Sequence, residues 1–373
     1  SYTGEDVMEL HLHGGRAVIE GVYSALSAQK GFRFAENGEF SKRAVINGRI
    51  DLTEAEGIND LINAETEAQR DQGLNQLEGA LRLQLEKWSN DLKGFGAHIE
   101  AYIDFPDEQI PENVLSDLLQ GVEETNRELK EFVDDDRKGE ILRSGLKVAV
   151  IGPPNVGKSS FVNWLTKRDI AITSEKAGTT RDIVEAHLDL GGYPVTVADT
   201  AGMRESEDTI EQEGIRRARS WSESADLRVL ILDPETAEDA NAFSDLLKSG
   251  DPVLMNKADR ITIVKKKMSA AYSLVSVKTG YGLESILSVL TTIAKRKMGT
   301  QKPTTITQAR HRALLNDCLT ALREAHFGLR NHADLELIAE DFRSAIYCIG
   351  RITGHIDVED LLDVVFKEFC IGK

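Results

Sequence analysis

An eight-residue glycine-rich segment constrains the fold of this chain more than any other feature. Gly152–Ser159 reads GPPNVGKS, which fits the pattern G-x-x-x-x-G-K-[ST], and it directly follows the apolar run Val148–Ile151. Such a loop binds phosphate when a strand precedes it and a helix follows it, because loop N–H groups and the positive helix end then converge. We therefore predict a phosphate-binding loop in which Lys158 contacts the β- and γ-phosphates and Ser159 binds Mg²⁺.

Short apolar runs alternate with helical stretches on either side of this loop. Four of them are typical of buried strands: Lys147–Ile151, Val195–Asp199, Leu227–Leu232 and Pro252–Met255. Alternation of this kind is typical of a doubly wound α/β domain, which we place at residues 147–300.

Two further segments complete the phosphate site. The tetrapeptide Asp199–Gly202 follows a predicted strand, so Asp199 is expected to hold Mg²⁺ through water and the Gly202 N–H to contact the γ-phosphate. The pentapeptide Gly178–Asp182 by itself is weak evidence for a nucleotide site. Because it lies between the other nucleotide motifs in the expected order, we interpret it as a loop whose Thr180 completes the Mg²⁺ coordination.

The hydrogen-bonding groups of one segment predict which nucleotide base the chain binds. In the segment Asn256–Asp259, Asp259 can accept two hydrogen bonds from the ring N–H and amine of guanine, a pair that adenine does not offer. Ser276–Lys278 lies where a last loop would contact the guanine carbonyl. The chain is therefore predicted to bind GTP.

The residue that orients the attacking water is not obvious. Regulatory GTPases place a glutamine directly after the Asp-Thr-Ala-Gly motif, but this chain has Met203 there. The following segment offers Arg204, Glu205, Glu207, Asp208, Glu211 and Glu213, and chemistry alone does not choose among them. Transition-state charge could be neutralised by Arg181 or Arg204, or by a monovalent cation beside Asn155.

The flanking residues have a different character. The net charge is −17, and residues 51–146 carry 24 acidic and 9 basic side chains, which disfavours this segment as a nucleic-acid surface. We predict a strand at Val7–His13, a helix at Ala17–Ala28, one or two long amphipathic helices over residues 51–100, and further helices over 113–136 and from Ile306 onward. This order indicates an α/β domain inserted into a helical one.

The cysteines and the apolar runs indicate the cellular compartment in which the protein is found. Cys318, Cys348 and Cys370 form no Cys-x-x-Cys pair, and no apolar run approaches the ~20 residues that span a bilayer. We expect a cytoplasmic protein with reduced thiols. Because the chain opens on Ser1 within strand-like sequence, we expect an N-terminal truncation.

The chain resembles the MnmE (TrmE) family of bacterial tRNA modification GTPases over essentially its whole length. Besides the nucleotide motifs, the segments that carry the resemblance are Tyr2–Asp6, His13–Gly15, Gly38–Ala44, Asp51–Glu56, Ile103–Glu108 and the terminal Phe369–Lys373. The last of these is highly specific.

The resemblance implies a multidomain architecture. A Ras-like α/β G domain (a P-loop NTPase) would occupy residues 147–300, inserted into an all-α helical domain formed by residues 49–146 and 301–373. Residues 1–48 would be part of an α+β N-terminal domain that dimerises and binds formyl-tetrahydrofolate, in a pocket that is incomplete here.

The resemblance also implies partners and mechanism. Family members act with an FAD-dependent partner, MnmG, forming a heterotetramer that modifies C5 of the wobble uridine of tRNA, an aminomethyl or carboxymethylaminomethyl type of modification. Their G domains dimerise across the nucleotides with K⁺ in place of an arginine finger.

Roles carry over to the matching positions. The catalytic positions are Glu211 for the attacking water, Lys158, Asn155 and the terminal Cys370. The K⁺ ligands would be Asn155, Ser174, the backbone of Lys176, and Thr179; the Mg²⁺ ligands would be Ser159, Thr180 and, through water, Asp199. The residues expected to contact nucleotide are Gly152, Asn155, Val156, Gly157, Lys158, Ser159, Ser160, Thr179, Thr180, Asp199, Thr200, Ala201, Gly202, Asn256, Lys257, Asp259, Ser276, Val277 and Lys278.

One alternative stays open at this point. The nucleotide motifs also fit a regulatory or ribosome-assembly GTPase that switches without modification chemistry. A basic RNA-binding module would favour that alternative, and the flanking segments contain none.

Cation dependence tests the predicted mechanism. GTP turnover should be much faster in K⁺ than in Na⁺ buffer, and Glu211→Ala should lose turnover while retaining nucleotide binding. Equal rates in both salts would instead indicate that Arg181 or Arg204 supplies the charge, or that the K⁺ mechanism does not apply.

Overall fold

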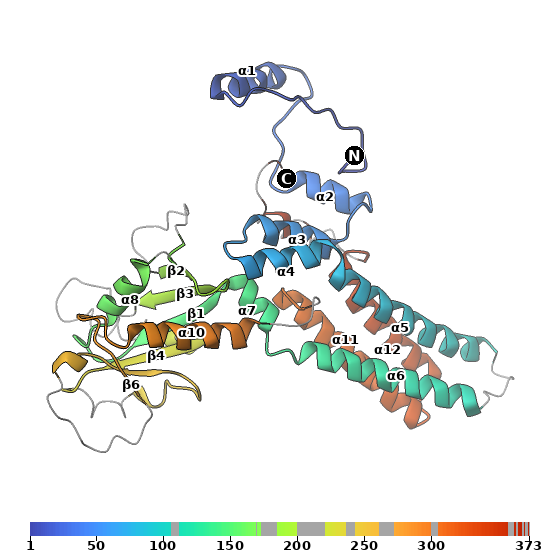
Figure 1. The fold of residues 1–373 in the computed structure, drawn as a ribbon. Helices are drawn as coiled ribbons and strands as arrows, with labels where there is room; N and C mark the ends of the chain where they lie inside the picture. The colour runs from blue at the N-terminus through green and yellow to red at the C-terminus, as the bar shows by residue number, and fades with distance from the viewer. Residues whose placement is uncertain are drawn as a thin grey trace, which may run out of the picture. The chain divides into compact units, whose positions relative to one another are not determined.

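The protein is described by a computed structural model in which the chain forms two compact units (Figure 1). Residues 1–105, 112–168, 170–172, 185–199, 221–235, 243–260, 272–299 and 305–356 are described, together with 362, 365–367, 369 and 372. The helical unit comprises Ser1–Asn63, Asp71–Asp135 and Lys302–Lys373. The sheet unit comprises Ala64–Arg70 and Asp136–Gln301.

The sheet unit contains a six-stranded sheet in the order β2-β3-β1-β4-β5-β6. Its strands are β1 (Leu146–Ile151), β2 (Glu185–Asp189), β3 (Pro194–Asp199), β4 (Leu227–Leu232), β5 (Val253–Met255) and β6 (Ser273–Leu274). Only β2 runs antiparallel to its neighbour, β3; the other pairs are parallel. The predicted α/β domain with a mostly parallel sheet is therefore confirmed.

Both faces of this sheet are buried, which explains why its central strands are apolar throughout. Along β1, Val148 and Val150 join one core cluster while Ala149 and Ile151 join another, because alternate side chains point to opposite faces. The first cluster also contains Phe161 of α8 (Lys158–Thr166) and residues of α10 (Leu283–Met298).

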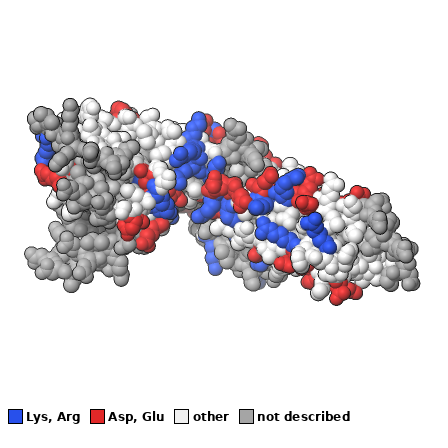
Figure 2. Space-filling model, turned by 90° about the horizontal axis from the view of Figure 1, so that it is seen from below, with Lys and Arg blue, Asp and Glu red and all other residues white. Residues whose placement is uncertain are grey.

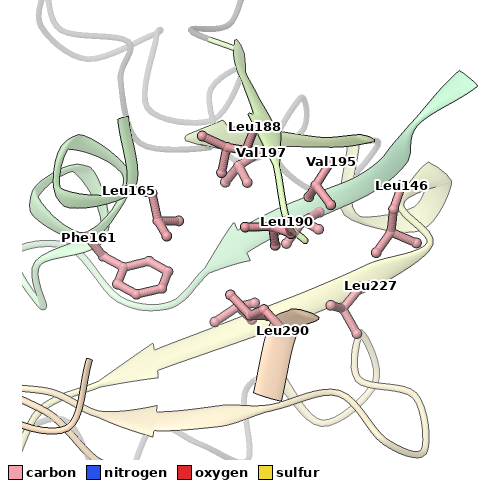
Figure 3. Close-up of a pocket in the computed structure, with 11 residues that line it drawn as sticks. Leu146, Phe161, Leu165, Leu188, Leu190, Val195, Val197, Leu227 and Leu290 are labelled. Atoms are coloured by element: carbon pink, nitrogen blue, oxygen red, sulfur yellow. The ribbon is translucent and has the colours of Figure 1, made fainter. Parts of the chain in front are cut away.

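The core on the α8 and α10 side encloses a small apolar cavity of about 10 Å³ (Figure 3). Figure 3 shows Phe161 and Leu165 on one side of it and Leu290 on another. Its lining is entirely aliphatic or aromatic, so it offers no polar partner to a water molecule and is a packing void, not a ligand site.

A short piece of chain from far upstream completes the sheet unit. The Ala68 N–H donates to the Gly192 carbonyl (3.1 Å), and the Gln69 amide nitrogen donates to the Arg143 carbonyl (3.1 Å). Arg143 belongs to α7 (Lys138–Ser144), which leads into β1. Ala68 also packs against the sheet's apolar core.

The helical unit contains long helices around one apolar core. Its helices are α1 (Arg16–Ser27), α2 (Glu39–Ile46), α3 (Leu52–Ile62), α5 (Ala80–Asp104), α6 (Glu112–Val133), α11 (Ala309–Arg330) and α12 (Leu335–Thr353), and it shares α4 (Glu67–Leu77) with the sheet unit. Figure 1 shows α5, α6, α11 and α12 lying side by side, and their buried faces form one cluster that includes Trp88 and Phe342. No helix in the described residues is long and apolar enough to cross a membrane.

The prediction of one or two helices over residues 51–100 was wrong in number, because three helices form there. Asp51 begins α3 with a capping box, accepting from the Glu54 N–H while the Glu54 carboxylate accepts from the Asp51 N–H. Gly79, at φ +81°, separates α4 from α5. These local signals interrupt an apolar periodicity that continues across them.

The strand predicted at Val7–His13 was also wrong. These residues form no strand, and Met8 is 86% exposed. A strand exists only where a neighbouring strand satisfies its N–H and C=O groups, and no described segment pairs with this one. The helix predicted at Ala17–Ala28 is confirmed as α1, with no buried residue.

Acidic side chains of the helical unit are interspersed with basic ones. Figure 2 shows Lys and Arg adjoining Asp and Glu on the face in view. Among the pairs are Arg343 with Glu100 (2.8 Å) and Lys87 with Glu128 (2.7 Å). Part of the charge at residues 51–146 is thus locally compensated.

Glu56, a carboxylate of the helical unit, is only 4% exposed. Glu56 on α3 lies 2.9 Å from the Arg310 guanidinium and 2.8 Å from the imidazole of His311, both on α11. The Arg310 guanidinium also donates to the Arg351 and Ile352 carbonyls of α12. Burial alone raises the pKa of Glu56, but His311 and Arg310 outweigh it, so the pKa lies below its ordinary value of 4.5.

Glu56→Gln should destabilise the helical unit by about 3 kcal/mol, because it leaves the partly buried Arg310 guanidinium without its counter-charge and the buried His311 imidazole without its carboxylate partner. The pKa of Glu56 is lower in the folded state, so its contribution is fully present above pH 4.5 and is lost as pH falls through the folded pKa. Calorimetric melting at pH 7 and at pH 3 measures both effects. Glu65→Gln, at an exposed glutamate, is the matched control; equal melting of the two variants at pH 7 would contradict the assignment.

Candidate functional site

The described parts of the predicted nucleotide motifs lie at one edge of the sheet. They follow the carboxyl ends of β1, β3, β5 and β6, and the ladder aligns these ends, since Val150 pairs with Asp199 and Met255 pairs with Leu274. In open α/β sheets this edge binds ligands. The sequence motifs, scattered over more than a hundred residues, therefore meet in one region.

The loop after β1 has a backbone that only particular residues allow. Gly152 has φ +142°, and a Cβ there would lie 2.1 Å from the Ile231 carbonyl oxygen. Gly157 has φ +102° and caps α8, and a Cβ there would lie 2.3 Å from the Asn256 amide nitrogen. Asn155 has φ +62°, which asparagine tolerates better than most residues. Both motif glycines are required by close backbone approach and by conformation.

Lys158 points into this loop. Its Nζ donates to the carbonyl oxygens of Gly152 (2.8 Å) and Pro153 (2.6 Å), and the residue is only 7% exposed. The charge is thus held at the amino end of α8, where helix dipole and loop N–H groups favour an anion. This arrangement suits a phosphate chain.

Asn256 joins three loops. Its amide nitrogen donates to the Val156 carbonyl (2.7 Å), and its amide oxygen accepts from the Val277 N–H (3.1 Å). Its backbone N–H donates to the Leu232 carbonyl at the end of β4 (2.7 Å). The phosphate loop and the last loop are therefore fixed relative to each other.

The residue predicted to recognise guanine presents its carboxylate outward. Asp259, in the short helix η2 (Ala258–Arg260), is exposed and accepts from the Ser276 hydroxyl (2.6 Å). This hydrogen bond is the main reason that the pKa of Asp259 lies below its ordinary value. Ser276, itself 1% exposed, restrains the orientation of the carboxylate through this hydrogen bond. Lys278, two residues after Ser276, is exposed.

The described residues suit a hard cation at the phosphate end. The hydroxyl-bearing Ser159 and the amide-bearing Asn155 are exposed at the loop, and the backbone of Asp199 ends β3 in register with β1. Oxygen donors of these kinds are those that Mg²⁺ and K⁺ prefer.

The remaining predicted positions lie outside the described residues. They are Ser174, Lys176, Thr179, Thr180, Arg181, Thr200, Ala201, Gly202, Met203, Arg204, Glu211 and Cys370. Their roles stay predictions.

Sequence reasoning missed Asp233. It directly follows β4, is 3% exposed, and forms an ion pair with Lys257 (2.5 Å). Its position directly after a fully buried strand was the available signal.

Comparisons with known proteins agree over the whole chain. Family models for the MnmE helical domain and for the GTP-binding protein TrmE N-terminus match residues 52–370 and 1–49. The tRNA modification GTPase MnmE of Parvibaculum lavamentivorans is 48% identical over 373 residues, covering all of this chain and 84% of that protein. Its counterpart in Rickettsia bellii is 47% identical over 381 residues, with the same coverage. Among solved structures, the G domain of the T. maritima FeoB iron transporter aligns at TM-score 0.31 and 24% identity, covering 40% of this chain and 98% of that one.

Gly157→Ala should weaken GTP and GDP binding at least tenfold, because the added Cβ would displace the Asn256 amide and strain a residue at φ +102°. Titration with labelled nucleotide measures the change. Gly94→Ala is the control, since that helical glycine in α5 has open space around it; it should leave affinity unchanged. Similar affinities for Gly157→Ala and the wild type would refute the tight packing of this loop.

Proposed function

Because the chain belongs to the MnmE family of tRNA modification GTPases, we propose that it couples GTP hydrolysis to modification of C5 of the wobble uridine in tRNA, with an FAD-dependent partner of the MnmG type. The product would be an aminomethyl or carboxymethylaminomethyl uridine. We place this activity in the cytoplasm.

One observation carries the proposal. The guanine-nucleotide loops converge at one sheet edge within a chain whose flanking segments match the MnmE and TrmE family models. A ribosome-assembly or purely regulatory GTPase would account for the nucleotide loops but not for the match outside residues 147–300.

In the proposed GTPase cycle, each loop has one task. Asp259 accepts hydrogen bonds from guanine, with Ser276 orienting it, while Lys158 and the start of α8 hold the β- and γ-phosphates. Ser159, Thr180 and, through water, Asp199 would hold Mg²⁺, which neutralises phosphate charge. Glu211 would orient the attacking water.

K⁺ would lie against Asn155, Ser174, Thr179 and the backbone of Lys176, supplying the positive charge that an arginine finger gives elsewhere. The exposed side-chain amide of Asn155 supports this, because its oxygen is available to a cation beside the phosphates. We propose that two G domains pair across the nucleotides, so that the homodimer opens and closes with hydrolysis.

Folate does not enter this mechanism. Formyl-tetrahydrofolate binding is expected of the N-terminal domain, to which residues 1–48 would belong, and these residues leave Met8 and Phe34 largely exposed. Cys370 is retained as a candidate at the modification centre. We propose domains at 1–48, 49–146, 147–300 and 301–373, although the compact sheet unit also takes in Ala64–Arg70 and residues 136–146. We further propose that two chains assemble with two partner chains as a heterotetramer.

Cells lacking the gene should contain tRNA with unmodified C5 at the wobble uridine, and the intact gene should restore the modification. Mass spectrometry of tRNA nucleosides measures this. Restoration should fail with Lys158→Ala, which removes the phosphate contact, and should succeed with the Gly94→Ala control. Unchanged wobble uridines in the deleted strain would favour the regulatory GTPase instead.

A further inference from the structure

Asp233 occupies a position from which it can act on the nucleotide site without touching it. It follows β4 directly and is 3% exposed. One carboxylate oxygen, Oδ1, accepts from the Glu235 N–H (3.1 Å), and the other lies 2.5 Å from the Lys257 Nζ. A carboxylate this deeply buried requires compensation by such partners.

Lys257 lies two residues before the guanine-binding Asp259 and has an unusual backbone. Its φ is +59°, a region that a lysine rarely adopts and that surrounding contacts must maintain. The neighbouring Ala258 N–H donates to the Val275 carbonyl (3.0 Å), and the Arg260 N–H donates to the Lys257 carbonyl (2.9 Å). Both bonds hold the peptide group that follows Lys257, and before it the Asn256 N–H donates to the Leu232 carbonyl (2.7 Å), so the main chain is held on both sides.

With the main chain and Nζ both held, the four-carbon stem of Lys257 has little freedom left. Its side chain is 23% exposed, against 4% for Asp233. A lysine stem is apolar along its length, and this one belongs to the same segment as Asp259, the residue expected to recognise the edge of a planar ring. A mobile lysine would have to lose side-chain entropy when nucleotide binds.

We propose that Asp233 is a positioning residue for guanine-nucleotide binding: it fixes Lys257 through their buried ion pair, so that the lysine stem supports the base. The inference rests on the proposed nucleotide site and extends it to the loop after β4. Because the stem would contact the ring face, the effect concerns binding of the base and not cleavage of the γ-phosphate.

The test uses the full chain and Asp233→Asn, which keeps the side-chain shape and removes the charge. Kd for GTP, GDP and ITP should each rise about tenfold, while kcat at saturating GTP stays unchanged. ITP lacks the 2-amino group that Asp259 would recognise. An equal rise in Kd for GTP and ITP would therefore show that support of the ring is lost, and not recognition of its edge. Asp259→Asn should instead change the ratio of GTP to ITP affinity.

A double-mutant cycle tests the coupling. Lys257→Met should weaken binding about as much as Asp233→Asn, and combining the two should add little further loss. Asp226→Asn is the control, since this aspartate lies at the opposite end of β4 and accepts from the Lys147 N–H. It should leave all three Kd values unchanged.

Three results would overturn the inference: unchanged Kd values in Asp233→Asn, additive losses in the double mutant, or a lower melting temperature without nucleotide as the only effect. Each presupposes that the wild type binds GTP tightly, so absence of wild-type binding would overturn the proposed nucleotide site itself. Asp233→Glu, which restores the charge at a different length, should recover part of the affinity.

Discussion

The nucleotide site depends on the side-chain amide of Asn256. The loops at this sheet edge have no ladder of their own, so side chains must fix their relative positions. Asn256 donates to the phosphate loop at Val156 and accepts from the last loop at Val277, while its backbone is bonded to the end of β4. One residue thus sets the distance between the phosphate-binding and base-binding ends of the site, and the absence of a Cβ at Gly157 leaves the space that this amide occupies.

Much of the fold could be predicted from the sequence because local signals and the overall architecture agree. The phosphate-loop motif requires a strand and a helix on its two sides, and β1 and α8 occupy those places. The helices over residues 51–100 were harder, since their apolar periodicity continues across the turns that separate them. Val7–His13 has the alternation of a strand, but alternation does not supply a pairing partner.

Other features depend on contacts between distant residues, which no local pattern reports. The partners of Glu56 lie more than 250 positions away, at Arg310 and His311, so the sequence alone showed only a glutamate on an amphipathic helix. Asp233 and Lys257 likewise become neighbours only when β4 and β5 pair. Asp259 could be predicted as the guanine-binding residue because a carboxylate can pair with the edge of guanine, whereas Ser276, which donates a hydrogen bond to it, belonged to a weak motif.

The contribution of Ala64–Arg70 to the sheet unit affects how the protein is made. During synthesis these residues leave the ribosome well before Arg143 and Gly192, the carbonyls that Gln69 and Ala68 will bond. At translation rates of about 5–20 residues per second, several seconds separate the two events. Residues 64–70 are therefore synthesised before the part of the sheet unit that they contact. They remain exposed to solvent until that part has been made. A fragment that begins near Asp136 would lack the contacts that Ala68 and Gln69 make in the whole chain.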